Sequence, residues 1–183
     1  INSIYGHIDR KNGKARNMLL SFSEMLRYQL YECNVDSIAI EKEIQYLRNY
    51  VALQQERKED NLRVVLDIAE DVRGFSVAPL LLVTFVENAF KYVSSYDNRA
   101  NEVVISLGRK GDALHFRAYN TKEEEMVQLQ LERGGIGIAN ARRRLDLQYP
   151  GRHELAIADN GDSYEVLLQL NIITNVTQSH YSR

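Results

Sequence analysis

The chain has 183 residues, of which 44% are hydrophobic and 26% are charged, which is enough for one packed domain and additional helices. The net charge of −2 provides no basic field for a nucleic-acid partner, and the single cysteine, Cys33, excludes an internal disulfide and a cysteine-rich metal site. No apolar run approaches the length of a membrane-spanning helix.

Two helices are predicted in the first third of the chain. Residues 15–32 and residues 40–58 each carry apolar side chains at three- and four-residue steps. A break at residues 34–37 separates them, and Asp36 or Ser37 can cap the second helix. Their apolar stripes either pack in a core or pair with a partner chain. We expect an α-helical, hairpin-like segment over residues 1–59.

From residue 60 the pattern changes to a mixture of strands and helices. Strands are predicted by β-branched and alternating residues, and Asp159-Asn160-Gly161-Asp162 is a strong hairpin signal between the last two. Pro79 suits the first turn of a helix that continues to about Val93. The predicted strands are 62–68, 102–108, 113–119, 153–158 and 164–170, with a second helix at 137–149. We therefore predict an α+β domain over residues 60–172, followed by a tail without pattern at 173–183.

Polar side chains follow the very apolar first turns of the helix that starts at Pro79. Asn88 and Lys91 are three residues apart and therefore share one helix face. An amide oxygen suits Mg²⁺, which usually keeps several waters, and a lysine can neutralise phosphate. The sequence Glu87-Asn88-Ala89-Phe90-Lys91 thus suggests a phosphate and cation site. The alternative is that the helix simply emerges into solvent at this point.

A glycine turn precedes the helix at residues 137–149. The backbone N–H groups of Gly134-Gly135-Ile136-Gly137 can face phosphate oxygens at the start of that helix. The turn lacks the Gly-Lys-Ser/Thr ending of a Walker loop, and no strand immediately precedes it as in a dinucleotide fingerprint. An ordinary loop-to-helix junction is the alternative. Arg133 can meet phosphate or lie on a solvated surface.

Asn120 lies where a predicted strand ends and a polar segment, residues 120–133, begins. Its amide can accept a hydrogen bond from the exocyclic amine of adenine and donate one to a ring nitrogen. An asparagine in a turn is the simpler interpretation. The sequence around Asn120 alone does not decide between them.

Four blocks, taken in order, resemble the LytS/YehU-type sensor histidine kinases over about residues 1–172. The resemblance implies a two-layer α/β sandwich of the histidine kinase ATPase type, a mixed sheet with helices on one face, as in gyrase, the chaperone Hsp90 and MutL. The blocks are Leu26-Arg27-Tyr28, Glu43-Ile44-Gln45-Tyr46-Leu47-Arg48-Asn49-Tyr50, Pro79-Leu80-Leu81-Leu82 with Val86-Glu87-Asn88-Ala89-Phe90-Lys91, and Gly135-Ile136-Gly137-Ile138-Ala139-Asn140-Ala141-Arg142-Arg143-Arg144-Leu145.

The resemblance also implies a site for ATP and Mg²⁺. Asn88 would hold the magnesium ion, Lys91 would contact phosphate, and Glu87 would support the site or the proton chemistry. Asn120 would read adenine beside a mobile lid at residues 121–133. The remaining nucleotide-binding positions would be Tyr92, Arg133, Gly135, Gly137, Ile138 and Asn140, with the two glycines as the hinge of the lid.

Two departures from the family pattern concern the nucleotide. Many relatives carry an aspartate followed by glycines at the adenine position, whereas this chain reads Asn120-Thr121-Lys122 without glycine. An amide accepts a hydrogen bond with less charge assistance than a carboxylate. Tyr92-Val93 replaces a frequent histidine-glycine pair. Both changes bear on nucleotide affinity.

A further expectation concerns the phosphorylated histidine. In this family it lies in an Asn-Pro-His-Phe block just before the segment that matches Ile1-Asn2-Ser3-Ile4, and His7 lacks that motif. We therefore expect this chain to be unable to autophosphorylate, and residues 1–59 to be a partial dimerisation and phosphotransfer region. The resemblance places the chain in the cytoplasmic part of a bacterial inner-membrane sensor, with membrane segments upstream.

The resemblance implies a protein histidine kinase that passes the γ-phosphoryl group of ATP to an upstream histidine and then to an aspartate of a response regulator. The implied partners are a receiver domain, with the LytTR DNA-binding class as one option, and a second copy of the chain. One alternative is a nucleotide-binding scaffold that has lost kinase activity. The other is an ATPase or chaperone of the same fold, which would need a general base for an attacking water.

Overall fold

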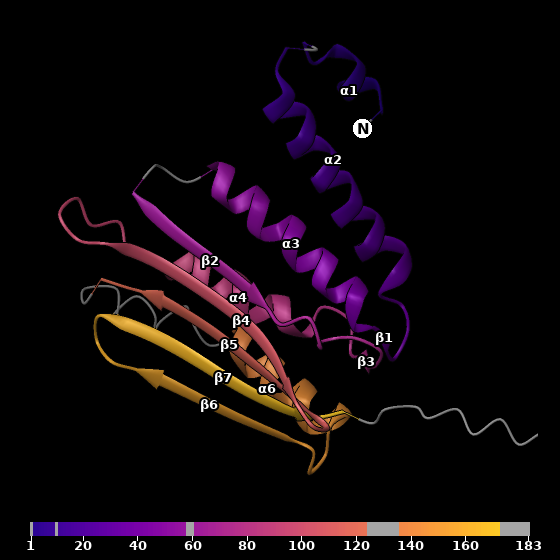
Figure 1. Ribbon diagram of the computed structural model, residues 1–183, viewed down its shortest axis with the longest axis vertical. Coiled ribbons are helices and arrows are strands. Elements are labelled where there is room, and N and C mark those ends of the chain that lie inside the picture. The colour runs from indigo at the N-terminus through magenta and orange to yellow at the C-terminus, as the bar shows by residue number, and fades with distance from the viewer. Residues whose placement is uncertain (1, 10, 58–60, 124–135, 173–183) are drawn as a thin grey trace, which may run out of the picture.

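A five-stranded mixed sheet forms one layer of the molecule, as the computed structural model of residues 2–9, 11–57, 61–123 and 136–172 shows (Figure 1). The first two strands in the sheet are parallel and the other neighbours are antiparallel. In spatial order the strands are β2 (Leu62–Ile68), β4 (Asn101–Lys110), β5 (Ala113–Thr121), β7 (Ser163–Asn171) and β6 (His153–Asp159). The predicted α+β class with a mixed sheet is confirmed.

Two helices, α4 (Leu81–Tyr92) and α6 (Ile136–Gln148), cover one face of this sheet (Figure 1). Alternate residues of β5 point to that face, and Leu114, Phe116 and Ala118 are buried there. The starting turns of α4 are apolar nearly all round because this helix lies between the sheet and α3 (Ile40–Arg57). The predicted helix-covered face is therefore confirmed.

The N-terminal helices extend beyond the sheet (Figure 1). They are α1 (Asn2–His7), α2 (Gly13–Arg27) and the π-helical turn η1 (Tyr28–Glu32), which continues α2. α2 packs along α3, as the predicted hairpin requires, and α3 in turn packs against α4 and β2. Ile40, Leu47 and Val51 of α3 belong to the same hydrophobic core as the sheet. The division between residues 59 and 60 stays a prediction.

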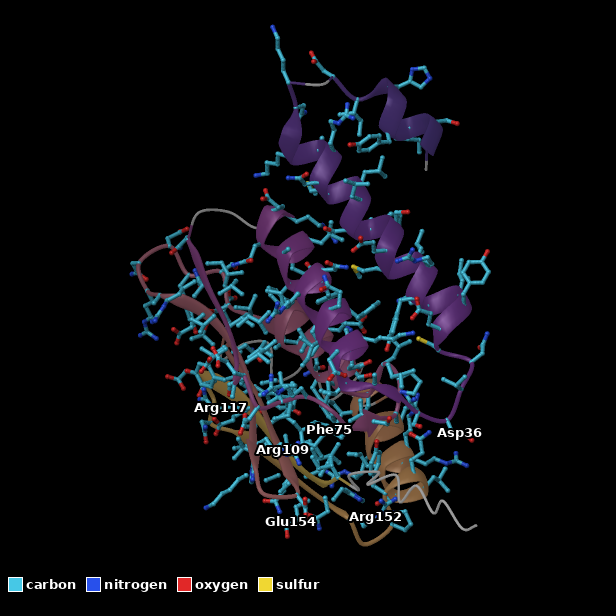
Figure 2. All side chains as sticks on the ribbon, turned by 45° about the vertical axis from the view of Figure 1, so that its right-hand side comes forward. Asp36, Phe75, Arg109, Arg117, Arg152 and Glu154 are labelled. Carbon is cyan, nitrogen blue, oxygen red and sulfur yellow. The ribbon has the colours of Figure 1, made fainter. Side chains whose placement is uncertain are left out.

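A second, two-stranded sheet joins β1 (Ile38–Ala39) to β3 (Ser76–Val77) in antiparallel register. Two-residue strands are too short for an alternating pattern, so the sequence did not predict them. The Ile40 N–H donates to the Phe75 carbonyl at 3.0 Å. The Arg109 guanidinium lies 5.5 Å from the centre of the Phe75 ring, and Figure 2 shows the two residues side by side. This contact covers the end of the core near the β1–β3 pair.

Local conformation shifts two of the predicted helix boundaries. α4 begins at Leu81 and not at Pro79, because Leu80 has a left-handed backbone with a φ of 57°. The predicted helix at 15–32 is α-helical to Arg27 and then π-helical to Glu32. Among the residues that the structure describes, no helix combines the length and apolar character needed to cross a membrane.

Candidate functional site

The last two turns of α4 carry the polar residues that the sequence singled out. Asn88 is half-buried and Lys91 is exposed. Within the described part of the chain, neither side chain makes a hydrogen bond; Lys91 Nζ lies 4.8 Å from the centre of the Tyr92 ring. Phe85 and Val86 are buried just before them, so the core fixes the helix while its polar end stays accessible. Asn88 and Lys91 are therefore available to a ligand.

Glu87 lies on the side of α4 that faces α3. Burial raises the pKa of Tyr46 and of Tyr50 to about 12, and the negative charge of Glu87 is the second cause in both. The residue itself is exposed, yet its surroundings partly remove water from the carboxyl group and raise its pKa. Glu87 is thus a carboxyl group that holds a proton more readily than one in free solution.

Asn120 is 1% exposed and joins the end of β5 to the end of α4. Its Nδ2 group donates to the Tyr92 carbonyl at 3.3 Å and to the Thr121 carbonyl at 3.0 Å. Among the described residues its Oδ1 atom accepts no hydrogen bond. Within the described part of the chain this amide oxygen is therefore open to a donor, which suits the exocyclic amine of adenine.

A polar network fixes the loop that follows α4 against the end of β5. Ser94 Oγ donates to Asn101 Oδ1 at 2.7 Å, and the Ser94 N–H donates to the Thr121 carbonyl at 2.8 Å. The Tyr96 hydroxyl donates to the Lys122 carbonyl at 2.8 Å. These bonds set the position of Tyr92 relative to Asn120.

Lys122 lies next to the candidate site, and the sequence did not single it out. Its side chain is fully buried, and its Nζ atom forms an ion pair with Asp159 at the end of β6. Burial opposes ionisation of Asp159, but hydrogen bonds from Lys122 and from the Gly161 N–H lower its pKa overall. One sequence signal could have indicated that Lys122 is buried. Every second residue of β5 is buried, and Lys122 continues this alternation beyond Asn120.

α6 brings a third element to the same region. Ala141 and Leu145 are buried and anchor the helix, Ile138 packs against the core, and Gly137 and Asn140 are exposed. Arg133 and Gly135 lie outside the described residues, as does most of the predicted lid.

Tyr164 of β7 lies between α6 and Asn120, the residue at the predicted adenine position. It is paired with Asn120 in the sheet. Burial raises the pKa of Tyr164, Asp159 adds to this, the charge of Arg142 opposes it, and Tyr92 raises it slightly. Residues from α4, α6, β5 and β7 therefore meet around Asn120.

The oxygen-bearing side chains here suit a Mg²⁺ ion that is bound mainly by phosphate and water and by few protein atoms. No group of three or more His, Cys, Asp or Glu residues that could hold a metal occurs among residues 2–9, 11–57, 61–123 and 136–172. Asn88 offers an amide oxygen without a hydrogen-bond partner among the described residues, three positions before Lys91 on the same helix. Mg²⁺ commonly binds through one or two protein oxygens together with phosphate and water, so this sparse set fits it.

Comparison with known proteins finds similarity to histidine kinases. A family model described as Histidine kinase matches residues 1–62. Sensor protein LytS of Staphylococcus saprophyticus is 29% identical over 157 residues, which cover 80% of this chain and 26% of that protein. Sensor histidine kinase YpdA of Escherichia coli is 29% identical over 156 residues, 81% of this chain and 27% of that protein. The chain thus spans about a quarter of the length of these relatives.

Solved structures share the fold at low identity. Full-length ShkA in complex with AMPPNP has a TM-score of 0.56 at 13% identity, over 88% of this chain and 37% of that one. The histidine kinase domain of a blue-light activated kinase from Erythrobacter litoralis has a TM-score of 0.54 at 14% identity, over 93% and 80%. The sequence matches and the four blocks of residues show that the chain is similar to LytS-type sensor histidine kinases, and the solved structures share its fold.

Proposed function

We propose that this chain is the ATP-binding catalytic portion of a two-component sensor histidine kinase. The observation that carries the proposal is that Asn120, at the end of β5, donates a hydrogen bond to the Tyr92 carbonyl at the end of α4, the helix that also carries Asn88 and Lys91. The AMPPNP bound to the structural neighbour ShkA supports ATP as the ligand.

Each of these residues has a distinct proposed role. The Asn120 Oδ1 atom accepts from the adenine amine, while its Nδ2 bonds to two backbone carbonyls hold that atom in place. The Asn88 amide oxygen binds Mg²⁺, and bound Mg²⁺ would neutralise phosphate charge. Lys91 supplies a further cation for the phosphate groups. Catalysis then consists of positioning and charge neutralisation.

Glu87 is proposed to take part in proton chemistry at the acceptor. Partial burial raises the pKa of its carboxyl group, which brings that group closer to the range in which it can exchange protons near neutral pH. The side chain lies at the α3 side of α4, toward the helices that we assign to the phosphotransfer region. Glu87 therefore acts beside, and not within, the proposed adenine site.

The proposal for the whole protein rests on the names of its relatives. The proposed acceptor is a histidine upstream of the segment described here, and the next acceptor is an aspartate on a response regulator, with the LytTR class as one option. The proposed assembly is a homodimer through α2, where Leu20 and Phe22 are exposed. The proposed location is the cytoplasmic side of a membrane sensor.

Calorimetric titration tests nucleotide binding directly. The chain is titrated with AMPPNP with and without Mg²⁺, and the Asn88→Ala variant is titrated in the same way. We expect magnesium to strengthen binding in the wild type and to have no effect in the variant. Equal magnesium dependence in both proteins would overturn the metal assignment.

A nucleotide-binding scaffold without kinase activity is the second candidate, because of Lys122. Its buried side chain lies two residues after the proposed adenine reader Asn120, in a stretch that contains no glycine here, whereas the family resemblance implies glycines after the adenine position. A side chain there takes up space that glycine leaves open. Lys122→Gly is therefore expected to raise affinity for AMPPNP if the lysine obstructs the base.

Phosphohistidine formation separates the two candidates. A longer form of the protein that includes the proposed acceptor histidine is incubated with ATP labelled in the γ-phosphate. Acid-labile labelling of the protein supports the kinase. AMPPNP binding without labelling, in the presence of Mg²⁺, supports the scaffold. Continuous phosphate release without labelling would point to an ATPase.

A further inference from the structure

A buried carboxyl group from α3 caps the first turn of α4. Glu43 is fully buried, and its Oε2 and Oε1 atoms accept from the backbone N–H groups of Leu80 at 2.9 Å and Leu82 at 3.3 Å. Leu80 stands at the N-cap position with a φ of 57° and has no side-chain oxygen to do this itself. Acceptors at a helix N-terminus satisfy N–H groups that have no partner in the helix. Glu43 therefore holds α4 from a neighbouring helix.

The same carboxyl group is bonded to the N-terminal helices. The Tyr28 hydroxyl donates to Glu43 Oε2 at 2.7 Å, and Tyr28 is 6% exposed. Tyr28 is the first residue of the π-helical turn η1. π-Helical turns are rare in proteins, and those that occur often lie at functional sites. One side chain thus links the end of α2 to the start of α4.

α6 reaches the same short turn from the other side. Arg144 donates through a guanidinium nitrogen to the Pro79 carbonyl at 2.5 Å. The Ala78 N–H donates to the Tyr149 hydroxyl at 2.7 Å. The turn before α4 is therefore bonded to α6 and to the residue that follows it, and it continues directly into α4. Both helices carry proposed nucleotide-binding residues. A shift of this turn is expected to displace both α4 and α6.

We propose that Glu43 is a positioning residue that couples the π-helical end of α2 to the nucleotide site, so that displacement of Tyr28 moves Asn88 and Lys91. α4 is a single helix of 12 residues without glycine or proline, and it transmits a shift at its first turn to its last. Hydrogen-bond networks and rigid helices can carry energetic coupling between two sites. The expected effect on nucleotide binding rests on the function proposed above.

A pair of tyrosines provides a matched test. Tyr28 and Tyr46 stack with ring centres 4.9 Å apart and both are buried, but the Tyr46 hydroxyl bonds to Gln29 and not to Glu43. Tyr28→Phe and Tyr46→Phe each remove one hydroxyl from this ring pair. Affinity for AMPPNP with Mg²⁺ is measured by calorimetry for both variants, for Glu43→Gln and for Tyr28→Phe combined with Glu43→Gln.

We expect Tyr28→Phe to weaken AMPPNP binding about tenfold, within the range usual for coupled sites, and Tyr46→Phe to change it less than about twofold. The combined variant should bind no more weakly than Glu43→Gln alone, because both changes break one path. Equal affinities for the two single tyrosine variants would overturn the proposal.

Hydrogen exchange tests the coupling without nucleotide. The amides of residues 81–92 should exchange faster in Tyr28→Phe than in Tyr46→Phe, since only the first variant loosens Glu43. Equal exchange in the two variants would overturn the coupling, whatever the nucleotide result. If wild-type protein binds no AMPPNP, the proposed function fails, and exchange alone then decides whether Glu43 couples the two helices.

Discussion

Asn120 Nδ2 donates to the Tyr92 carbonyl at 3.3 Å, so the end of β5 and the last turn of α4 are joined at the proposed adenine position. Tyr92 follows directly after Lys91 and lies one helical turn from Asn88. The bond therefore fixes the proposed adenine reader relative to the proposed phosphate and magnesium groups. This relationship links the three parts of the site within one rigid corner of the fold.

Removal of the Asn120 amide is expected to affect both stability and binding. Asn120→Ala loses two hydrogen bonds to backbone carbonyls in a buried position, which should lower the free energy of unfolding by about 2 kcal/mol. Urea denaturation measures this change. AMPPNP affinity should fall at least about tenfold, since the base loses its acceptor. Asn49→Ala, at an exposed hydrogen bond to Glu24, is the control. A folded Asn120→Ala variant with unchanged affinity would contradict the adenine assignment.

Substitution of Gly137 tests whether glycine is needed at this position for folding or for nucleotide binding. A Cβ atom at this helical position would meet nothing within 4 Å, so Gly137→Ala should fold normally and gain up to about 1 kcal/mol of stability. If the Gly137 backbone approaches phosphate, the added methyl group should still weaken AMPPNP binding several-fold. Thermal unfolding and calorimetry test the two expectations. Higher stability together with unchanged affinity would remove Gly137 from the site.

The stability of the fold should depend on pH through Glu43. Burial raises the pKa of Glu43 above its ordinary value of 4.5, although hydrogen bonds from Tyr28 and two backbone N–H groups oppose the rise. The folded protein therefore holds this proton more tightly than the unfolded chain. The stabilisation is complete below pH 4.5 and is lost as the pH rises through the folded-state pKa. Relative to Glu43→Gln, wild-type protein should lose stability over that interval; a pH-independent difference in urea denaturation would contradict this.

Asp159 should make the stability of the fold depend on pH in the opposite direction to Glu43. Its pKa lies below its ordinary value of 3.8, because the hydrogen bonds from Lys122 and the Gly161 N–H outweigh burial. Its stabilisation is therefore present above pH 3.8 and is lost as the pH falls through the lowered pKa. Asp159 is partly exposed, so Asp159→Asn should cost about 1 kcal/mol or less at neutral pH. In acid unfolding, the stabilities of wild-type protein and Asp159→Asn should converge at low pH. A difference in stability that persists there would show that it does not come from the charge of Asp159.

The sequence predicted the features that depend on near neighbours in the chain. Alternation of apolar residues gave the five strands of the large sheet to within a few residues, and Asp159-Asn160-Gly161-Asp162 gave the last hairpin. The helix that carries Asn88 and Lys91 followed from its apolar start. Chain-local patterns therefore led to most of the fold and to the main candidate residues.

The features that the sequence missed depend on partners far away in the chain. Lysine is rarely buried, and the burial of Lys122 depends on Asp159, which lies on a different strand. Glu43 accepts from the N-cap residue of α4, Leu80, which lies 37 residues later, so no local capping pattern marks it. The β1–β3 pair consists of two-residue strands that only the tertiary fold brings together. Residues 124–135, with Arg133 and Gly135, lie outside the described residues, and their predicted roles stay predictions.

Calorimetric titration of the 183-residue chain with AMPPNP, with and without Mg²⁺, tests the central claim most directly. We predict binding that strengthens with Mg²⁺, and loss of this magnesium dependence in Asn88→Ala while the variant stays folded. Absence of binding up to millimolar AMPPNP in wild-type protein, or the same magnesium dependence in the variant, would contradict the site proposed around Asn88, Lys91 and Asn120.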